Sequence, residues 1–266
     1  EAYSISEEEL VDMKKFADEV GIDCTSTPFS KKEVDFLVDV MAAPFIKVAS
    51  MDLNNYPFLH YIAAKGKPVV ISTGLSEAYE IDKAIRTIEE AGNKQIVILH
   101  CVSTYPPKNE DVHLNNIDTL RTLYPGYPIG FSDHTLGFEV PLASVAKGVC
   151  LIEKHFTLDK NMEGWDHKVS ATPDEMKIIV EGSKKIYESM GSGRIAVTES
   201  REKIQSFRRS IVTTREIRAG EVIKLTDLEF KRPGDGIAPE FLDFVVGRTA
   251  KVVLPFDKPI QRDQLV

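Results

Sequence analysis

Hydrophobic residues follow two different spacings along the chain up to about Gly191. In the segments 10–20 and 34–41 they recur every three or four positions, which is the spacing of an amphipathic helix. Short, often β-branched apolar runs lie at 22–25, 45–49, 69–71, 96–99, 129–131 and 149–152. Apolar runs separated by helices are typical of parallel strands buried on both faces. The pattern predicts six βα units, and the last helix begins at Pro173, because proline fits the first turn of a helix.

Polar residues with useful chemistry follow each of these apolar runs. They lie at 24–27, 47–50, 72–74, 100–103, 132–134 and 153–155. In a (β/α)8 barrel the active site is built at the carboxyl ends of the strands, whereas an open doubly wound sheet binds ligands only at its switch point. Polar residues at all the strand ends favour the closed barrel. We therefore predict an α/β fold of the TIM-barrel type, with six of the eight βα units present.

The pattern changes after the glycines at 191 and 193. Residues 194–207 are polar and are predicted to form a linker. Short alternating segments then follow at 210–214, 221–223, 228–232 and 251–254, with proline and glycine between them. This pattern predicts a small β-rich domain at 208–266, after a barrel domain at 1–193.

Composition narrows the class of protein further. With 42% hydrophobic and 28% charged residues, the chain is an ordinary globular sequence, and no apolar run is long enough to span a membrane. A net charge of −8 argues against nucleic acid as a partner. Three scattered cysteines are too few for a disulfide framework or a cysteine metal site. We expect a cytoplasmic protein without a membrane or nucleic-acid partner.

Several short phrases at the strand ends are similar to those of one enzyme family. They are 26–29 (STPF), 47–50 (KVAS), 71–74 (ISTG), 99–101 (LHC), 105–106 (YP), 132–135 (SDHT), 152–157 (IEKHFT) and 166–168 (DHK). In this order they make the chain resemble the sialic acid synthases, which include N-acetylneuraminate, legionaminate and pseudaminate synthases. Residues 208–210 and 231–234 resemble the antifreeze-like (SAF) domain of that family. Family members begin with two further βα units that nothing here matches, so the resemblance implies an N-terminally truncated barrel.

The resemblance also implies a reaction. The family condenses phosphoenolpyruvate with N-acetylmannosamine or a related amino-sugar aldehyde, and the products are a nonulosonic acid and phosphate. The implied cofactor is a divalent metal ion, Mn²⁺ before Mg²⁺ or Co²⁺. The implied assembly is a domain-swapped homodimer.

His134 and His155 follow successive strands, and two imidazoles with open positions suit a borderline divalent ion. The resemblance places the metal ligands at these two histidines, which we also expect to be catalytic. Asp52 is the carboxylate expected to transfer a proton, with a helix cap as the alternative reading. His100 is interpreted as a packed strand-end histidine.

The remaining assignments concern the two substrates. By resemblance, phosphoenolpyruvate is bound by Thr27, Lys47, Ser50, Ser72, Ser103 and Ser132, because a lysine and several hydroxyls can cradle a phosphate. The sugar is expected to meet Tyr105, Asp166 and Arg232. Arg232 lies in the small domain and is expected to reach the site of a partner subunit.

Three alternatives stay open. Another metal-dependent barrel aldolase or lyase could use the same two histidines. The chain could also be an inactive fragment of such a synthase. A non-catalytic carbohydrate-binding or ice-binding protein is the third, although the threonines of the small domain, at 213, 214, 226 and 249, lack the regular spacing that an ice-binding face needs.

Overall fold

The computed structural model describes residues 5–266. The chain forms two compact units that divide between Gly193 and Arg194. Within the described residues, no helix is long and apolar enough to cross a membrane.

The first unit is built on one parallel sheet whose strands follow each other in chain order. The strands are β1 (Ile46–Val48), β2 (Val69–Ser72), β3 (Ile96–Cys101), β4 (Ile129–Asp133) and β5 (Ile152–Lys154). Every neighbouring pair is parallel, so all the carboxyl ends lie at the same edge of the sheet. The predicted fold class is confirmed: the unit is a five-stranded half-barrel of the TIM type.

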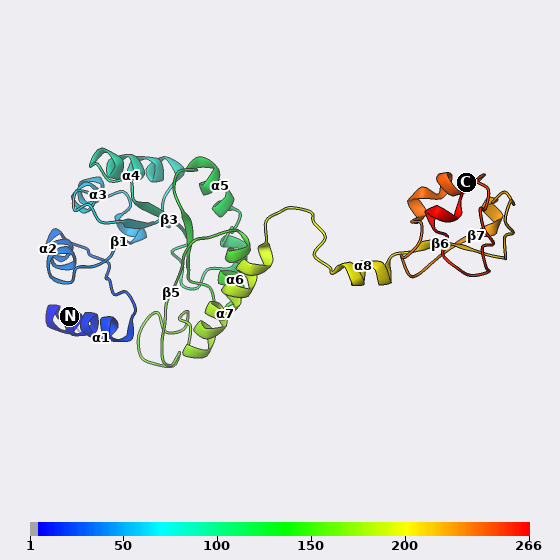
Figure 1. The fold of residues 1–266 in the computed structure, drawn as a ribbon. Helices are drawn as coiled ribbons and strands as arrows, with labels where there is room; N and C mark the ends of the chain where they lie inside the picture. Colours follow the sequence, from blue (N-terminus) through cyan, green and yellow to red (C-terminus); the bar gives the residue numbers. More distant parts are fainter. Residues whose placement is uncertain (1–4) are drawn as a thin grey trace. The chain divides into compact units, whose positions relative to one another are not determined.

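The helices of the first unit are α1 (Glu7–Val20), α2 (Lys31–Asp35), α3 (Tyr56–Ala63), α4 (Ala78–Glu90), α5 (Asn116–Leu123), α6 (Glu139–Ala146) and α7 (Pro173–Met190). Helices α3 to α7 cover the outer side of this sheet, whereas α1 lies apart from the strands (Figure 1). Helix α7 begins at Pro173 as predicted. Its N-terminus is closed by a capping box, in which Thr172 accepts from the backbone of Glu175 and the Glu175 side chain accepts in return.

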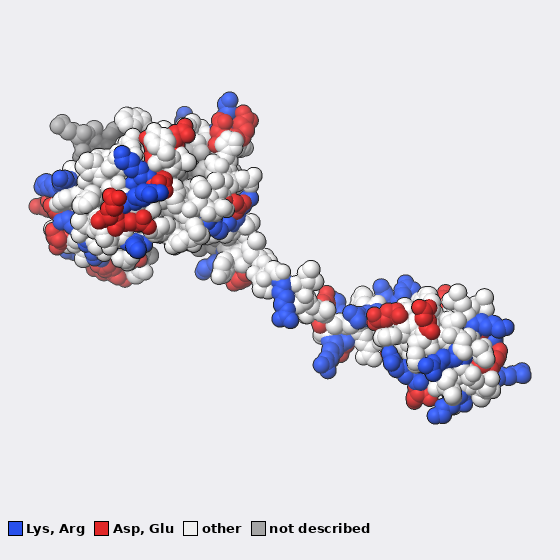
Figure 2. Space-filling view, turned by 90° about the horizontal axis from the view of Figure 1, so that it is seen from above, with Lys and Arg blue, Asp and Glu red and all other residues white. Residues whose placement is uncertain are grey.

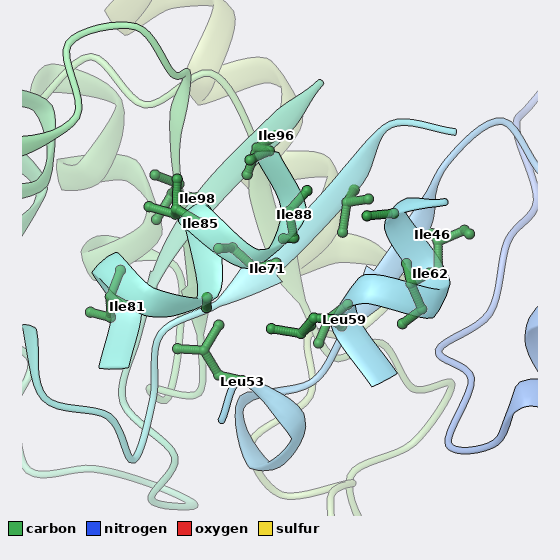
Figure 3. Close-up of a cluster of buried hydrophobic side chains, with 14 of the residues drawn as sticks. Ile46, Leu53, Leu59, Ile62, Ile71, Ile81, Ile85, Ile88, Ile96 and Ile98 are labelled. Atoms are coloured by element: carbon green, nitrogen blue, oxygen red, sulfur yellow. The ribbon is translucent and has the colours of Figure 1, made fainter. Parts of the chain in front are cut away.

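The main hydrophobic core fills the space between the strands and the outer helices. Ile46, Ile71 and Ile98 of the strands meet side chains of α3 and α4, among them Leu59 and Ile88 (Figure 3). All five are essentially inaccessible to solvent. The core side of β1 to β4 is covered by helices, and apolar runs in the sequence overlap these four strands. β5 reads Ile-Glu-Lys and is only partly buried.

One predicted strand is wrong. Residues 22–25 are extended but pair with no strand among the described residues, and Ile22 is 63% exposed. Their link to the sheet is the Thr25 hydroxyl, which donates to the carbonyl of Phe45 at 2.8 Å. A strand forms only where its backbone N–H and C=O groups bond to those of a neighbouring strand. One side-chain hydrogen bond does not supply this backbone pairing. The first unit therefore has five strands where six were predicted.

Helix α1 forms where the spacing predicted it, between the capping residue Ser6 and the left-handed Gly21. Of its predicted apolar face, Ala17 is buried, while Met13, Phe16 and Val20 are at least half exposed. The helix thus forms where its capping residues predict it, but most of the apolar face that the spacing predicted to be buried is exposed.

The second unit has its own core. Strands β6 (Ser210–Thr213) and β7 (Leu228–Lys231) pair antiparallel, and short helix α9 (Leu242–Val245) packs nearby. The predicted segments 221–223 and 251–254 each contribute to an isolated bridge, Val222 with Thr249 and Leu254 with Ile217. The interior is formed by Ile211, Ile217, Ile223, Ile237, Val245, Ala250, Leu254 and Ile260. Within the stretch predicted as a linker, 201–207 forms helix α8 (Arg201–Phe207).

Candidate active site

A cavity of about 290 Å³ lies at the carboxyl ends of the strands, and this size is at the lower end for small-ligand pockets. It is lined by Thr27, Phe29, Lys47, Ala49, Ser50, Ser72, Cys101, Tyr105, Ser132, His134, Glu153, Lys154 and His155. Eight of the twelve residues that the sequence singled out are in this set. The parallel register thus gathers residues that are up to 128 positions apart, from Thr27 to His155.

Lys47 is the buried cation of this cavity. Its residue is 8% exposed, and its ammonium donates to the Ser72 hydroxyl at 2.8 Å and to the carbonyl of Val48 at 3.0 Å. The carboxylate of Glu153 lies 3.5 Å away. Burial lowers the pKa of Lys47, and the charge of Glu153 opposes that shift. A buried ammonium is costly unless anions compensate it, so the site favours a second negative group beside Lys47.

Three serine hydroxyls surround the region next to Lys47. A Cβ placed on Gly74 would lie 2.7 Å from the Ser50 hydroxyl and closer still to that of Ser103, so both serines crowd against this glycine. Ser132 donates to Glu153 at 2.7 Å. Ser103 lies at the wall of a neighbouring cavity of about 460 Å³ that shares Cys101 with the first.

His134 and His155 face each other from adjacent strands, with ring centres 5.2 Å apart. The ring of Tyr105 packs on both, at 4.0 Å from His134 and 5.7 Å from His155. Nδ1 of His134 lies 2.8 Å from the carbonyl of Val102. Since a carbonyl only accepts, Nδ1 carries the proton, and this hydrogen bond fixes the orientation of the ring.

The two imidazoles differ in their affinity for protons. Burial acts against protonation of His134, but hydrogen bonds to Cys101 and to the Val102 carbonyl outweigh it and raise the pKa of His134. Burial and the neighbouring His134 lower the pKa of His155, although Asp166 and Glu153 oppose this. The two rings thus differ in their preference for the protonated form, and each must be neutral to act as a metal ligand.

The residues of this cavity could hold a divalent metal ion through two imidazoles. No group of three or more His, Cys, Asp or Glu side chains that could hold a metal occurs within residues 5–266. Two neighbouring imidazoles, of which that of His134 is held by the Val102 carbonyl, nevertheless suit an ion that fills its other positions with water or substrate oxygens. His134 and His155 are the residues that would hold it.

Sequence reasoning gave no role to five residues that line the cavity, Phe29, Ala49, Cys101, Glu153 and Lys154; of these, Cys101 and Glu153 bond to residues of the site. Both lie on one rung of the sheet, because Cys101 is aligned with Ser132 and Ser132 with Glu153. Glu153 also precedes His155 by two positions, and residues two apart in a strand point to the same face. That alternation was the available signal for Glu153.

Four of the sequence-predicted residues do not line this cavity. Ser103 lines its neighbour, as described above. Asp52 ends a short 3-10 turn, where its carboxylate accepts from the side-chain amide of Asn55 at 3.2 Å. Asp166 lies 3.9 Å from Nδ1 of His155, at the edge of the site. Arg232 belongs to the second unit, where its guanidinium stacks on Phe207 at 5.0 Å.

His100 is packed as the sequence suggested. It is 5% exposed, its Nε2 lies 2.6 Å from the carbonyl of Val112, and its ring stacks on Phe131. Burial lowers its pKa, which favours the neutral ring.

The Cys101 thiol provides a test of this geometry. Burial raises the pKa of a thiol, but the hydrogen bonds from His134 and Ser50 outweigh it and lower the pKa of Cys101. Burial raises the pKa of Cys150. In a pH series of iodoacetamide labelling read by mass spectrometry, we expect the midpoint for Cys101 to lie below that for Cys150. His134→Ala should move the Cys101 midpoint upward, and an unchanged midpoint in this variant would contradict the contact.

Comparisons with known proteins match the whole chain. Residues 1–195 match the sequence profile of the NeuB family, and residues 208–266 match that of the SAF domain. An uncharacterized protein of Methanocaldococcus jannaschii is 44% identical, over 98% of this chain and 77% of its own length. The N,N'-diacetyllegionaminic acid synthase of Legionella pneumophila is 38% identical, over 92% of this chain and 70% of its own.

A solved structure agrees with these matches. The crystal structure of the N-acetylneuraminic acid (sialic acid) synthetase of Leptospira borgpetersenii, in complex with citrate, has a TM-score of 0.71 and 32% identity. The match covers 75% of this chain and 69% of that one. Enzymes of this family generally use a divalent metal. The chain therefore belongs to the NeuB family of sialic, legionaminic and pseudaminic acid synthases, with a C-terminal SAF domain.

Proposed function

We propose that this chain condenses phosphoenolpyruvate with an N-acylated amino-sugar aldehyde to give a nonulosonic acid and inorganic phosphate. C3 of phosphoenolpyruvate forms a bond to the aldehyde carbon, water adds at C2, and the bond from C2 to the phosphate oxygen breaks. One observation carries the proposal: a buried lysine with serine hydroxyls lies in the same cavity as two facing imidazoles. A phosphorylated substrate and an aldehyde need these two kinds of group.

Phosphoenolpyruvate is assigned to the side of the cavity that holds Lys47. Its phosphate supplies the second anion that this buried ammonium favours, and the hydroxyls of Ser50, Ser72 and Ser132 can donate to its oxygens. Thr27 lines the same cavity, and Ser103 reaches this region across Gly74. The charge of Lys47 acts in a largely desolvated place, where an electrostatic interaction is stronger than in water.

The aldehyde is assigned to the side of the cavity that holds His134 and His155. A divalent ion bound there, Mn²⁺ as first choice with Mg²⁺ or Co²⁺ as alternatives, would polarise the aldehyde oxygen as a Lewis acid. Tyr105 packs against His134 and meets His155 edge-on, so it limits the space beside both imidazoles, and Asp166 at the rim can accept from sugar hydroxyls. These groups orient the aldehyde carbon toward C3 of phosphoenolpyruvate.

Glu153 is the carboxylate best placed for proton transfer. It lines the cavity between Lys47 and His155, and its side chain is 40% exposed, so a water molecule can reach it. Asp52 is the second candidate, and its bond to Asn55 holds it in a turn that does not line the cavity. General acid–base catalysis by a positioned carboxylate contributes about 10² to 10⁴ in rate.

The second unit is proposed to complete the site of a partner subunit in a domain-swapped homodimer, with Arg232 over the sugar. Residues 194–266 contain more basic than acidic residues, whereas the whole chain has 33 basic and 41 acidic ones. Lysine and arginine side chains are spread over the surface of this unit (Figure 2). A basic unit and an acidic barrel attract each other, and an arginine suits an anionic or hydroxyl-rich ligand.

We propose three candidate classes of amino sugar as the second substrate. The matched relatives make different products, because one is a diacetyllegionaminic acid synthase and another a sialic acid synthetase. The substrate is therefore N-acetylmannosamine, a diacetylated analogue or an altrose-type sugar. Trp165, 93% exposed next to Asp166, is the residue at the rim whose size would affect the choice.

The central test is release of inorganic phosphate. We expect it to require phosphoenolpyruvate together with one of the three sugars, and to need Mn²⁺ or a substitute ion. His134→Ala should reduce the rate by at least about 100-fold, because a ligand of the Lewis acid is lost. The exposed His60 provides the matched control, and His60→Ala should keep the wild-type rate. Cleavage of a sugar acid without phosphate release would instead identify an aldolase, and inactivity with every sugar would contradict the proposal.

Gly74 supplies a test of the phosphate side. A methyl group at this position would push into the hydroxyls of Ser50 and Ser103. We expect Gly74→Ala to raise KM for phosphoenolpyruvate by about tenfold or more, which corresponds to a typical overpacking cost. Gly126, whose added Cβ would meet open space, gives the control Gly126→Ala. Equal KM values for the two variants would contradict the assignment of the phosphate to Ser50 and Ser103.

The exchange of the second unit can be tested by mixing two inactive variants. Arg232→Ala keeps both imidazoles, and His134→Ala keeps the arginine. In a mixed dimer the cavity of the first variant receives Arg232 from the second, so co-expression should restore up to about a quarter of wild-type turnover for a two-fold symmetric dimer. If each chain uses its own Arg232, the mixture will stay as inactive as the separate variants.

A further inference from the structure

A buried ion pair joins the last residues of β4 and β5. The ammonium of Lys154 lies 2.7 Å from a carboxylate oxygen of Asp133, and the two side chains are 2% and 0% exposed. The other oxygen of Asp133 accepts from the backbone N–H of Thr135 at 3.0 Å and from its hydroxyl at 2.8 Å. Lys154 also donates to the carbonyl of Thr135. The pair is therefore hydrogen-bonded on both sides and closed to solvent.

This pair sits immediately before the two imidazoles. Asp133 and Lys154 are aligned across the sheet, and His134 and His155 are the next residue of each chain segment. Side chains alternate between the faces of a strand, so the pair occupies the face opposite to the Ser132–Glu153 hydrogen bond that borders the cavity. The pair thus joins the two strand ends next to the candidate metal site, and Lys154 is itself among the residues that line the cavity.

The network also brackets His134. Asp133, which belongs to the pair, precedes this histidine, and Thr135, which follows it, is hydrogen-bonded to both members of the pair. The backbone of His134 is therefore held on both sides. The ring itself is held by the carbonyl of Val102. On the other strand, the carbonyl of His155 accepts from the N–H of Ala171 at 2.7 Å. The backbone ladder brings the ends of β4 and β5 together, and the Asp133–Lys154 link adds a side-chain bond between the residues that precede the two imidazoles.

A gain in folding stability is a weak explanation for a buried lysine–aspartate pair. The desolvation of two charges offsets most of their attraction, and uncharged replacements of similar volume often leave a protein equally stable. The cores next to this pair are formed by apolar residues without such charges. A fixed distance between two strand ends is what a directional, fully bonded pair adds beyond apolar packing.

We propose that Asp133 and Lys154 are positioning residues that hold His134 and His155 at the separation needed to bind a divalent metal ion. The inference rests on the proposed function, because it assigns a role toward the metal of that site. Neither residue needs to touch substrate. Outer groups that orient metal ligands typically contribute about 10- to 100-fold to metal affinity.

The test compares Mn²⁺ binding, measured by titration calorimetry and by electron paramagnetic resonance, in variants without added substrates. In Asp133→Asn/Lys154→Met no charge is left unpaired, and the asparagine oxygen can still accept from Thr135. We expect Mn²⁺ affinity to fall about 10- to 100-fold, while phosphoenolpyruvate affinity and the melting temperature change little. Thr135→Val, a nearly isosteric change that loosens only one bond of the network, should give a smaller loss.

The matched control is a lysine–aspartate pair of the same length on the surface. Lys147 lies 2.7 Å from Asp118, with both side chains at least one third exposed, and Lys147→Met should leave Mn²⁺ affinity unchanged. Wild-type Mn²⁺ affinity in both Asp133→Asn/Lys154→Met and Thr135→Val would overturn the positioning role and leave the proposed function intact. Should the double variant fail to fold, Thr135→Val decides alone. If the wild-type protein binds no Mn²⁺, the metal site of the proposed function fails, and this inference fails with it.

Discussion

The parallel pairing of five strands is the constraint on which the rest of this molecule depends. Because each strand runs in the same direction as its neighbours, all the carboxyl ends meet at one edge. Residues as distant in sequence as Lys47 and His155 thereby line one cavity. The apolar side chains between the sheet and its helices hold this arrangement, and the polar residues at the edge are left free for chemistry.

Charge is arranged in two layers around the strand ends. In the cavity, the ammonium of Lys47 lies 3.5 Å from the carboxylate of Glu153, whose side chain is 40% exposed. Lys154 and Asp133 form a second pair, 2.7 Å apart, whose side chains are 2% and 0% exposed. An open pair can accept an anionic ligand, whereas a closed pair can only hold its surroundings in place. In the proposals above, a lysine–carboxylate pair has one role when it is open to the cavity and another when it is enclosed and fully bonded.

The two compact units contribute different residues. The first unit supplies the imidazoles, the hydroxyls and the buried lysine, and the second has a separate core around Ile211 and Ile260. Arg232, the one site residue expected in the second unit, stacks on Phe207 of α8 within that unit. In the proposed homodimer, Arg232 would reach the site of the partner subunit.

Local signals in the sequence determined the elements. The apolar runs at 45–49, 69–71, 96–99 and 129–131 coincide with β1 to β4, whereas the run at 149–152 overlaps β5 (Ile152–Lys154) only at Ile152. Pro173 marked the start of α7. Polar residues at the strand ends indicated where the cavity would lie. Residues 22–25 have the same apolar character but form no strand, because pairing needs a neighbour at the right place and the sequence does not show one.

Only the tertiary structure decided which polar residues meet. Asp52 and Glu153 both follow or end an apolar run, yet Glu153 lines the cavity while Asp52 bonds to Asn55 in a turn. The difference comes from strand register, which aligns Glu153 with Ser132 and depends on hydrogen bonds between distant segments. The pairing of Lys154 with Asp133 has the same origin. Sequence fixes the chemical groups that a chain carries, and the register of the folded sheet sets the distances between them.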